Sequence, residues 1–209
     1  RTSFTPVNSD HLLLGPGPSA PYPEAVEALQ RPVLGHLDAE YLGVVAGIAD
    51  RLRAVFRTSN ELTLPVSGTG SAGMEACVVS LVEPGETVIV GVNGYFGERL
   101  CEVARRAGAQ VVRVEAPWGT ALDPADLLAA RRARPEAAVL ALVAAETSTG
   151  VRNDVAPVGA ELAGTDTLLL VDAVTALGGT PLEVDAWGID ACYSASQKCL
   201  GAPPGLAPV

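Results

Sequence analysis

Histidine, cysteine and charged residues are scarce in this chain, and each scarcity excludes a class of protein. The 209 residues include two histidines and four cysteines. No two cysteines have the C-x-x-C spacing of a zinc site or a redox motif, so no metal site is expected. Charged residues make up 18% of the chain and hydrophobic residues 48%, which argues against disorder and predicts a large core.

Long apolar runs and an excess of positive charge are also missing. No stretch of about 18 apolar residues predicts a membrane span, and the first residues lack the apolar core of a signal peptide. The net charge of -10 argues against nucleic acid or an anionic membrane as the partner. We interpret the cysteines as reduced residues in or near the core of a cytoplasmic protein, namely Cys77, Cys101, Cys192 and Cys199.

Apolar runs alternate with amphipathic segments through most of the chain. Strands are predicted over 62–66, 87–92, 110–114, 138–144, 167–171 and 189–193. Helices are predicted over 23–30, 38–56, 71–82, 98–107, 124–134 and 155–163. This alternation predicts one α/β domain over residues 23–209, with a mainly parallel sheet covered by helices, after an extended N-terminal segment over 1–22. Ligands of such sheets bind outside the carboxyl ends of the strands.

The second predicted helix, over 38–56, has apolar residues at helical spacing. They share one face, opposite charged residues such as Asp50, and include Leu42, Val45 and Phe56. The pattern is typical of an amphipathic helix.

A glycine-rich turn, Gly68-Thr69-Gly70-Ser71-Ala72-Gly73, stands between a predicted strand and a predicted helix. Glycines allow a tight turn there, and the amides at a helix start bind anions. A dinucleotide site would also need an acid at the end of the next strand, but that strand ends in Asn93-Gly94. The turn therefore indicates another kind of phosphate cradle, with a tight turn that binds nothing as the alternative.

Asp172 follows the apolar run Leu168–Val171. A strand that ends in an acid is typical of magnesium-binding P-loop enzymes, but the chain contains no G-x-x-x-x-G-K-[ST] sequence. Two interpretations remain at this point. The carboxylate caps the next turn, or it holds a positively charged ring nitrogen.

Lys198 follows the apolar run 189–193 within a series of small residues, a poor setting for a solvated charge. An S-x-x-K acyl-enzyme is excluded, because the residue three positions before it is Ala195. A desolvated lysine can lose its proton and form an imine with a carbonyl compound. Lys198 is therefore a candidate catalytic residue, although spacing alone does not decide this.

A phosphate cradle, an acid and an amine match the phosphate, ring nitrogen and aldehyde of pyridoxal 5'-phosphate (PLP). On these residues the chain resembles the class V PLP-dependent aminotransferases of fold type I, in the branch of alanine–glyoxylate and serine–pyruvate aminotransferases. The resemblance covers nearly the whole chain, with landmarks at 13–18, 67–70, 93–97, 146–151, 171–174, 178–182 and 194–198.

The resemblance implies a role for each candidate residue. Lys198 would form the Schiff base and act as general base, and Asp172 would pair with the pyridinium nitrogen. The remaining cofactor contacts would be Thr69, Gly70, Ser71 and Gln197 at the phosphate, Phe96 on the ring face, Thr147 at the ring oxygen, and Val174. Relatives often have Trp in place of Phe96, so Phe96 as a core residue and Thr147 as a turn residue remain alternatives.

The resemblance also implies an activity and an assembly. We expect a transaminase that moves an amino group from alanine or serine to glyoxylate or pyruvate, in a homodimer with shared active sites. Residues 23–209 would be the PLP-binding large domain, with a seven-stranded, mainly parallel sheet. A smaller domain beyond Val209 would carry the arginine for the substrate carboxylate, and a peroxisomal location stays open. The alternatives are a 2-aminoethylphosphonate or ureidoglycine aminotransferase, a lyase or desulfurase, or an inactive fragment.

Overall fold

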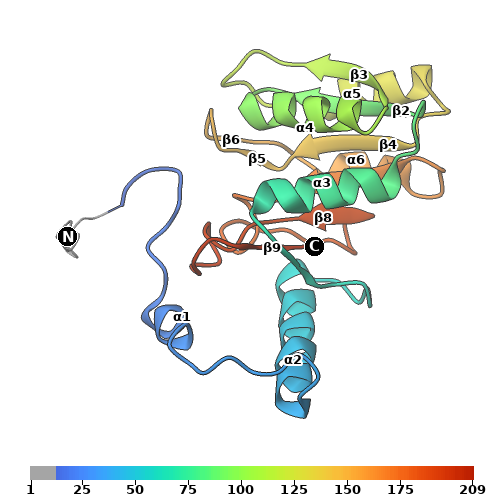
Figure 1. Cartoon of the computed structure of the whole chain (residues 1–209). Coiled ribbons are helices and arrows are strands. Elements are labelled where there is room, and N and C mark those ends of the chain that lie inside the picture. The colour runs from blue at the N-terminus through green and yellow to red at the C-terminus, as the bar shows by residue number, and fades with distance from the viewer. Residues whose placement is uncertain (1–12) are drawn as a thin grey trace.

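The computed structural model describes residues 13–209 (Figure 1). His11, Leu12 and the first part of the predicted N-terminal segment lie outside the described residues. The helices are α1 (Pro23–Ala28), α2 (Ala39–Phe56), α3 (Gly70–Leu81), α4 (Tyr95–Arg106), α5 (Pro124–Ala133) and α6 (Ala156–Leu162). The strands are β1 (Pro65–Ser67), β2 (Thr87–Val92), β3 (Gln110–Glu115), β4 (Val139–Val143), β5 (Ala145–Glu146), β6 (Val151–Arg152), β7 (Leu168–Asp172), β8 (Ala191–Tyr193) and β9 (Leu206–Pro208).

Five parallel strands form the central sheet, in the order β3-β2-β4-β7-β8. β9 pairs antiparallel with β1. It is also joined to the chain just after β8, because the amides of Ser194 and Ser196 donate to the carbonyls of Pro208 (2.8 Å) and Leu206 (3.0 Å). Within residues 13–209, these hydrogen bonds place β9 and β1 beside the five-stranded sheet, and the predicted mainly parallel α/β fold is confirmed.

Helices cover both faces of this sheet (Figure 1). Val88 and Val90 of β2 pack in one hydrophobic core with residues of α3 and α4, whereas Ile89 packs in a second core with residues of α5 and α6. A strand buried on both faces needs apolar side chains at consecutive positions. This explains why β2, β4 and β7 are almost continuous apolar runs in the sequence.

The first strand is shorter and later than predicted. The amide of Leu62 donates to Oδ1 of Asn60 (2.9 Å), and the hydroxyl of Thr63 donates to the carbonyl of Asn60 (2.7 Å). These side-chain hydrogen bonds hold residues 60–63 in a turn, as Asn and Thr often do. Leu62 is 75% exposed. The strand therefore begins at Pro65.

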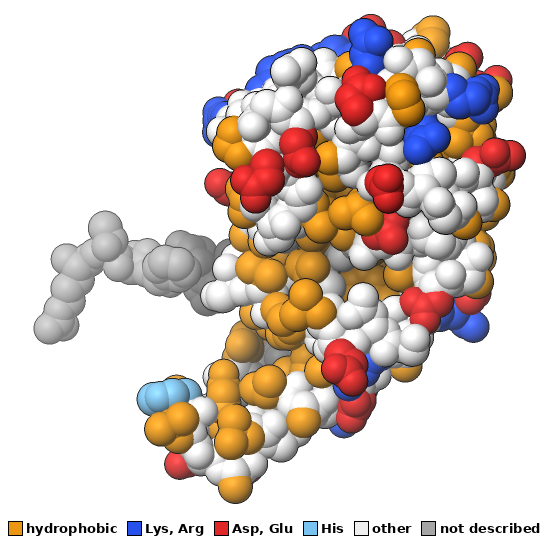
Figure 2. Space-filling model, turned by 90° about the vertical axis from the view of Figure 1, so that its right-hand side faces the viewer, with side chains coloured by type: hydrophobic (Ala, Val, Ile, Leu, Met, Phe, Trp, Pro, Cys, Tyr) orange, Lys and Arg blue, Asp and Glu red, His pale blue; other side chains and the backbone are white. Residues whose placement is uncertain are grey.

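α2 buries its apolar face only at its C-terminal end. Phe56 is 2% exposed, whereas Leu42 is 53% exposed and Val45 is 40% exposed. Figure 2 shows apolar side chains gathered on the projecting part of the molecule. Within the described part of the chain, nothing covers the N-terminal half of the apolar face of α2.

The prediction that all four cysteines lie in or near the core is wrong for one of them. Cys77, Cys101 and Cys192 lie on α3, α4 and β8 and are buried, but Cys199 lies in the turn over 196–200 and is exposed. All four are free thiols. Among residues 13–209, no helix combines the length and the apolarity that crossing a bilayer requires.

Candidate active site

Several of the predicted site residues meet at the carboxyl ends of β7 and β8. Asp172 is the last residue of β7, and the parallel register places it beside Tyr193, the last residue of β8. A Cβ on Gly70, the first residue of α3, would lie 3.1 Å from Cβ of Ala195 and 3.1 Å from Cγ2 of Val174. The start of α3 therefore packs against the segments that follow both strands. This edge is where parallel α/β sheets bind ligands.

Asp172 is a buried carboxylate with two hydrogen-bond donors. Its Oδ1 accepts from the amide of Val174 (2.9 Å) and its Oδ2 accepts from the hydroxyl of Tyr193 (2.8 Å). The pKa of Asp172 is raised to about 6: burial is the main cause and the nearby charge of Glu146 adds to it, whereas both hydrogen bonds and Lys198 oppose the rise. No Lys or Arg within residues 13–209 forms an ion pair with this carboxylate. A cationic ligand atom would favour its ionised form.

Lys198 is the only lysine in the sequence. Its Nζ donates to the carbonyl of Pro16 (2.9 Å) and, within the described residues, forms no ion pair with a carboxylate. A Cβ on Gly17, whose φ is 128°, would lie 2.6 Å from this Nζ. The amide of Ser19 also donates to the carbonyl of Gln197 (2.8 Å). The N-terminal segment thus lies directly against the lysine, and a glycine is required where it passes the amine.

The start of α3 has unsatisfied donors. Gly68, with φ 141°, turns the chain, and Thr69 is the N-cap residue without a side-chain capping bond. Among the described residues, no acceptor pairs with the amides of Gly70 and Ser71. Oε1 of Gln197 is buried without a partner. Because the first-turn amides of a helix carry partial positive charge, the free amides of Gly70 and Ser71 suit an anion, whereas Oε1 of Gln197 is an acceptor and suits a donor.

Phe96 and Thr147 belong to a second group of residues. Phe96 lies in the first turn of α4, half-buried, with its ring perpendicular to that of Tyr95 (87°, centroids 5.3 Å apart). Thr147 is half-buried in the turn between β5 and β6. No hydrogen bond joins either side chain to Asp172 or Lys198 in residues 13–209. Thr147 follows β4, which pairs with the strand β7 that carries Asp172.

Two residues with a structural bearing on the site had no role in the sequence analysis. Tyr193 contacts the carboxylate of Asp172 directly. Its signal was its position at the end of a strand, but the pairing of β7 with β8 was needed to place it beside Asp172. Glu146 is 1% exposed and has no cation beside it within the described chain. Its signal was an acid directly after the apolar residues of β4.

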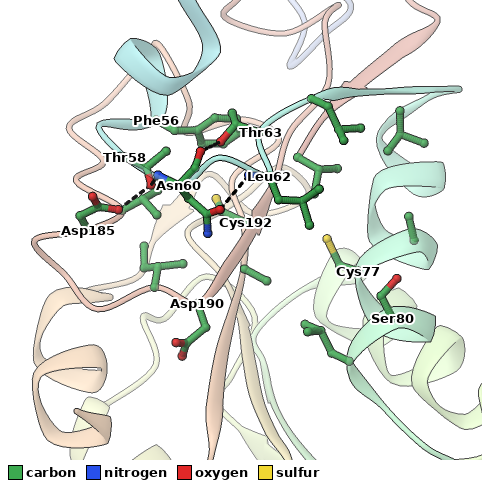
Figure 3. Close-up of a pocket in the computed structure, with 18 residues that line it drawn as sticks. Phe56, Thr58, Asn60, Leu62, Thr63, Cys77, Ser80, Asp185, Asp190 and Cys192 are labelled. Atoms are coloured by element: carbon green, nitrogen blue, oxygen red, sulfur yellow. Dashed lines mark hydrogen bonds between the residues drawn. The ribbon is translucent and has the colours of Figure 1, made fainter. Parts of the chain in front are cut away.

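A cavity of about 300 Å³ lies elsewhere in the molecule (Figure 3). Cys77, Cys192 and Phe56 line it together with Asp190, which precedes β8. None of the predicted site residues lines it. The cavity is near the beginning of β8, whereas the candidate active site is at its end.

The residues at the carboxyl edge fit PLP, the cofactor that the resemblance implies. The helix start offers free backbone amides to a phosphate. Asp172 offers a buried carboxylate to a ring nitrogen, and Lys198 offers an amine without a carboxylate partner in the described residues. These are the groups needed at the three functional ends of that molecule.

The chain is similar to known aminotransferases over almost all of its length. It is 37% identical over 210 residues to (S)-ureidoglycine–glyoxylate transaminase of Bacillus subtilis, covering 100% of this chain and 49% of that protein. It is 39% identical over 199 residues to alanine–glyoxylate aminotransferase of Drosophila melanogaster, covering 94% of this chain and 50% of that protein. The chain spans about half the length of these curated relatives.

Solved structures give the same result. The crystal structure of alanine–glyoxylate aminotransferase from Nostoc sp. is similar with a TM-score of 0.93 and 47% identity, over 99% of this chain and 55% of that chain. Ureidoglycine–glyoxylate aminotransferase from Bacillus subtilis is similar with a TM-score of 0.94 and 36% identity, over 100% of this chain and 53% of that chain. The family described as Aminotransferase class-V matches residues 24–208. The chain therefore belongs to the class V aminotransferases.

Proposed function

We propose that this protein is a PLP-dependent aminotransferase that moves an amino group from a small amino acid, alanine or serine, to glyoxylate or pyruvate. The observation that carries the proposal is the meeting of Asp172, the free start of α3 and the segment of Lys198 at one edge of the sheet. Membership of the class V aminotransferases supports it.

Each site residue would have a defined role. PLP, when bound, supplies an electron-accepting ring that stabilises negative charge at the α-carbon of the amino acid. Asp172 would keep the ring nitrogen protonated through an ion pair. Lys198 would provide the amine that binds the cofactor and then accept and return the α-proton as general base. The phosphate would be held by the α3 amides with Thr69, Gly70, Ser71 and Gln197, and the ring by Phe96, Thr147 and Val174.

The choice of substrate rests on the relatives. The names of two similar proteins, from Bacillus subtilis and Drosophila melanogaster, both include glyoxylate, whereas their amino donors differ. Glyoxylate is therefore the acceptor with the best support. A screen of alanine, serine, ureidoglycine and 2-aminoethylphosphonate as donors, with glyoxylate and pyruvate as acceptors, would decide between the proposed activity and its alternatives.

A homodimer with shared active sites is part of the proposal. The exposed apolar side chains near and on α2, such as Leu37 (78% exposed), Leu42 (53%) and Val44 (50%), form a surface that a second copy could bury. Sedimentation velocity tests this, with Leu42→Asp expected to shift the protein towards the monomer.

We also propose that residues 1–22 are an N-terminal segment, that 23–209 are the PLP-binding large domain, and that the protein is cytoplasmic.

Covalent trapping tests the cofactor directly. The chain is mixed with PLP, reduced with borohydride, digested and analysed by mass spectrometry. Because Lys198 is the only lysine, the expected result is a pyridoxyl group on its peptide, and Lys198→Ala removes this label together with transamination. A wild-type protein that gains no label at Lys198 would contradict the proposed function.

A further inference from the structure

Glu146 is a buried carboxylate that binds backbone amides and no cation. It is 1% exposed, and among residues 13–209 no Lys, Arg or His forms an ion pair with it. Oε2 accepts from the amides of Phe96 (3.1 Å) and Gly97 (3.3 Å). Oε1 accepts from the amide (3.0 Å) and the hydroxyl (2.7 Å) of Ser148. A buried charge is costly unless it is hydrogen-bonded, and here both oxygens have two donors.

These hydrogen bonds complete the start of α4. The amide of Tyr95 donates to Oγ of Ser148 (2.9 Å), so Glu146 and Ser148 together satisfy the amides of three consecutive residues in the first turn. The N-terminus of a helix carries partial positive charge, which favours a carboxylate at this place. A Cβ on Gly94 would lie 2.3 Å from Cγ of Glu146, so only glycine leaves room for this side chain.

The carboxylate joins two segments that are distant in the sequence. Its Oε2 binds the amide of Phe96, 50 positions away, and its Oε1 binds Ser148, the residue next to Thr147. Phe96 and Thr147 are the residues proposed for the ring face and the ring oxygen of PLP. One side chain therefore sets the backbone position of both.

We infer that Glu146 is a positioning residue of the cofactor site, which holds Phe96 and Thr147 in place through the backbone of α4 and of the turn after β5. This inference rests on the proposed function, because it concerns how the ring of PLP is held. A carboxylate accepts hydrogen bonds at both oxygens. In a glutamine, an NH2 group replaces one of these oxygens, and it cannot accept from the two donors that it would face.

The first measurement uses cofactor-free protein. Amide hydrogen exchange is compared between wild type, Glu146→Gln and Glu75→Gln, a control at an exposed position of α3. In Glu146→Gln, the NH2 group replaces one acceptor oxygen, so we expect either the amides of Phe96 and Gly97 or the amide of Ser148 to exchange faster by about tenfold or more. Amides of β2 and β4 should exchange as in wild type. Unchanged exchange at the three amides would overturn the inference.

The second measurement follows the bound cofactor. We expect Glu146→Gln to weaken PLP binding by about tenfold and to reduce the visible circular dichroism per bound PLP, whereas Glu75→Gln matches wild type. Phe96→Ala supplies a double-mutant cycle. If Glu146 acts through Phe96, adding Glu146→Gln to Phe96→Ala produces less further loss of affinity than it does in wild type. Full additivity together with unchanged dichroism would overturn the inference.

Further variants keep the outcome clear. Ser148→Ala removes one side-chain donor and leaves the carboxylate, so it tests the hydrogen bonds of Glu146 if Glu146→Gln does not fold. We expect a smaller change in amide exchange and in PLP affinity, in the same direction. If wild type and Glu75→Gln bind no PLP, the proposed function fails. If all proteins bind PLP with the same affinity and dichroism, the role of Glu146 fails and the proposed function stands.

Discussion

Replacing Asp172 by asparagine should make the cofactor-free protein more stable. Burial raises the pKa of Asp172 from 3.8 to about 6 in the folded protein. One pKa unit corresponds to about 1.4 kcal/mol, so keeping this group ionised costs the folded state about 3 kcal/mol at neutral pH. Asparagine is neutral, and the hydroxyl of Tyr193 can turn from donor to acceptor for its NH2. Asp172→Asn should therefore raise the free energy of unfolding by up to about 3 kcal/mol.

The direction of the pH dependence follows from the same shift. The folded pKa of Asp172 is above the unfolded value, so between about pH 4 and pH 6 the folded state binds more protons than the unfolded state. Stability from this group is present at low pH and is lost as the pH rises through about 6. The advantage of Asp172→Asn should be full at about pH 8 and small at about pH 4.

Urea unfolding of cofactor-free wild type and Asp172→Asn at several pH values measures this advantage. Asp166→Asn, at an exposed position, controls for the loss of one charge. The same Asp172→Asn protein should bind PLP more weakly than wild type, since its amide cannot neutralise a ring cation. The reasoning would be refuted by an Asp172→Asn protein that is less stable than wild type at about pH 8, or by an advantage that does not change with pH.

Four further substitutions test the contacts around the site and the core. Tyr193→Phe removes a donor from Asp172, so it should destabilise the protein by about 1–3 kcal/mol and raise the pKa of Asp172, seen as a higher midpoint in the pH profile of stability. Gly17→Ala places a methyl group 2.6 Å from Nζ of Lys198 at a φ of 128°, so it should slow borohydride trapping of PLP at Lys198 severalfold; an unchanged rate would contradict the contact. Gly159→Ala in α6 would place a Cβ 1.7 Å from the carbonyl oxygen of Trp187, so it should lower the free energy of unfolding by about 3 kcal/mol or more. Gly43 in α2 has open space around it, so Gly43→Ala should raise the free energy of unfolding by up to about 1 kcal/mol. Equal effects of these two glycine substitutions in urea unfolding would refute the packing argument.

The periodicity of apolar residues predicted most of the helices and strands, because the spacing of apolar residues in each element follows which of its faces are buried. β2 was predicted with its observed bounds, since both faces of that strand are covered and every position is apolar or small. The predicted start of one helix is wrong because side chains distant in the sequence replace a local signal there. α4 begins at Tyr95 and not at Glu98, because Glu146 and Ser148 supply acceptors to its first amides.

The exposed N-terminal half of α2 shows a second limit of prediction from periodicity. Its apolar spacing is that of a buried face, and the sequence contains no signal for what covers that face. The structure shows Leu42 and Val45 exposed within the described residues. Amphipathic spacing therefore predicts that a face is apolar, but not which surface it meets.

The local sequence was sufficient to predict the chemical groups of the site, which are an acid after an apolar strand, a lysine among small residues, and glycines before a helix. These are properties of consecutive residues, so they can be read without knowing the fold. The partners of these groups depend on contacts between segments far apart in the chain. The parallel register of β7 and β8 brings the hydroxyl of Tyr193 to Asp172. The N-terminal segment comes to lie on Lys198, and Glu146 ties Phe96 to the turn that holds Thr147. Such contacts follow from how the elements pack, and no single stretch of sequence encodes them.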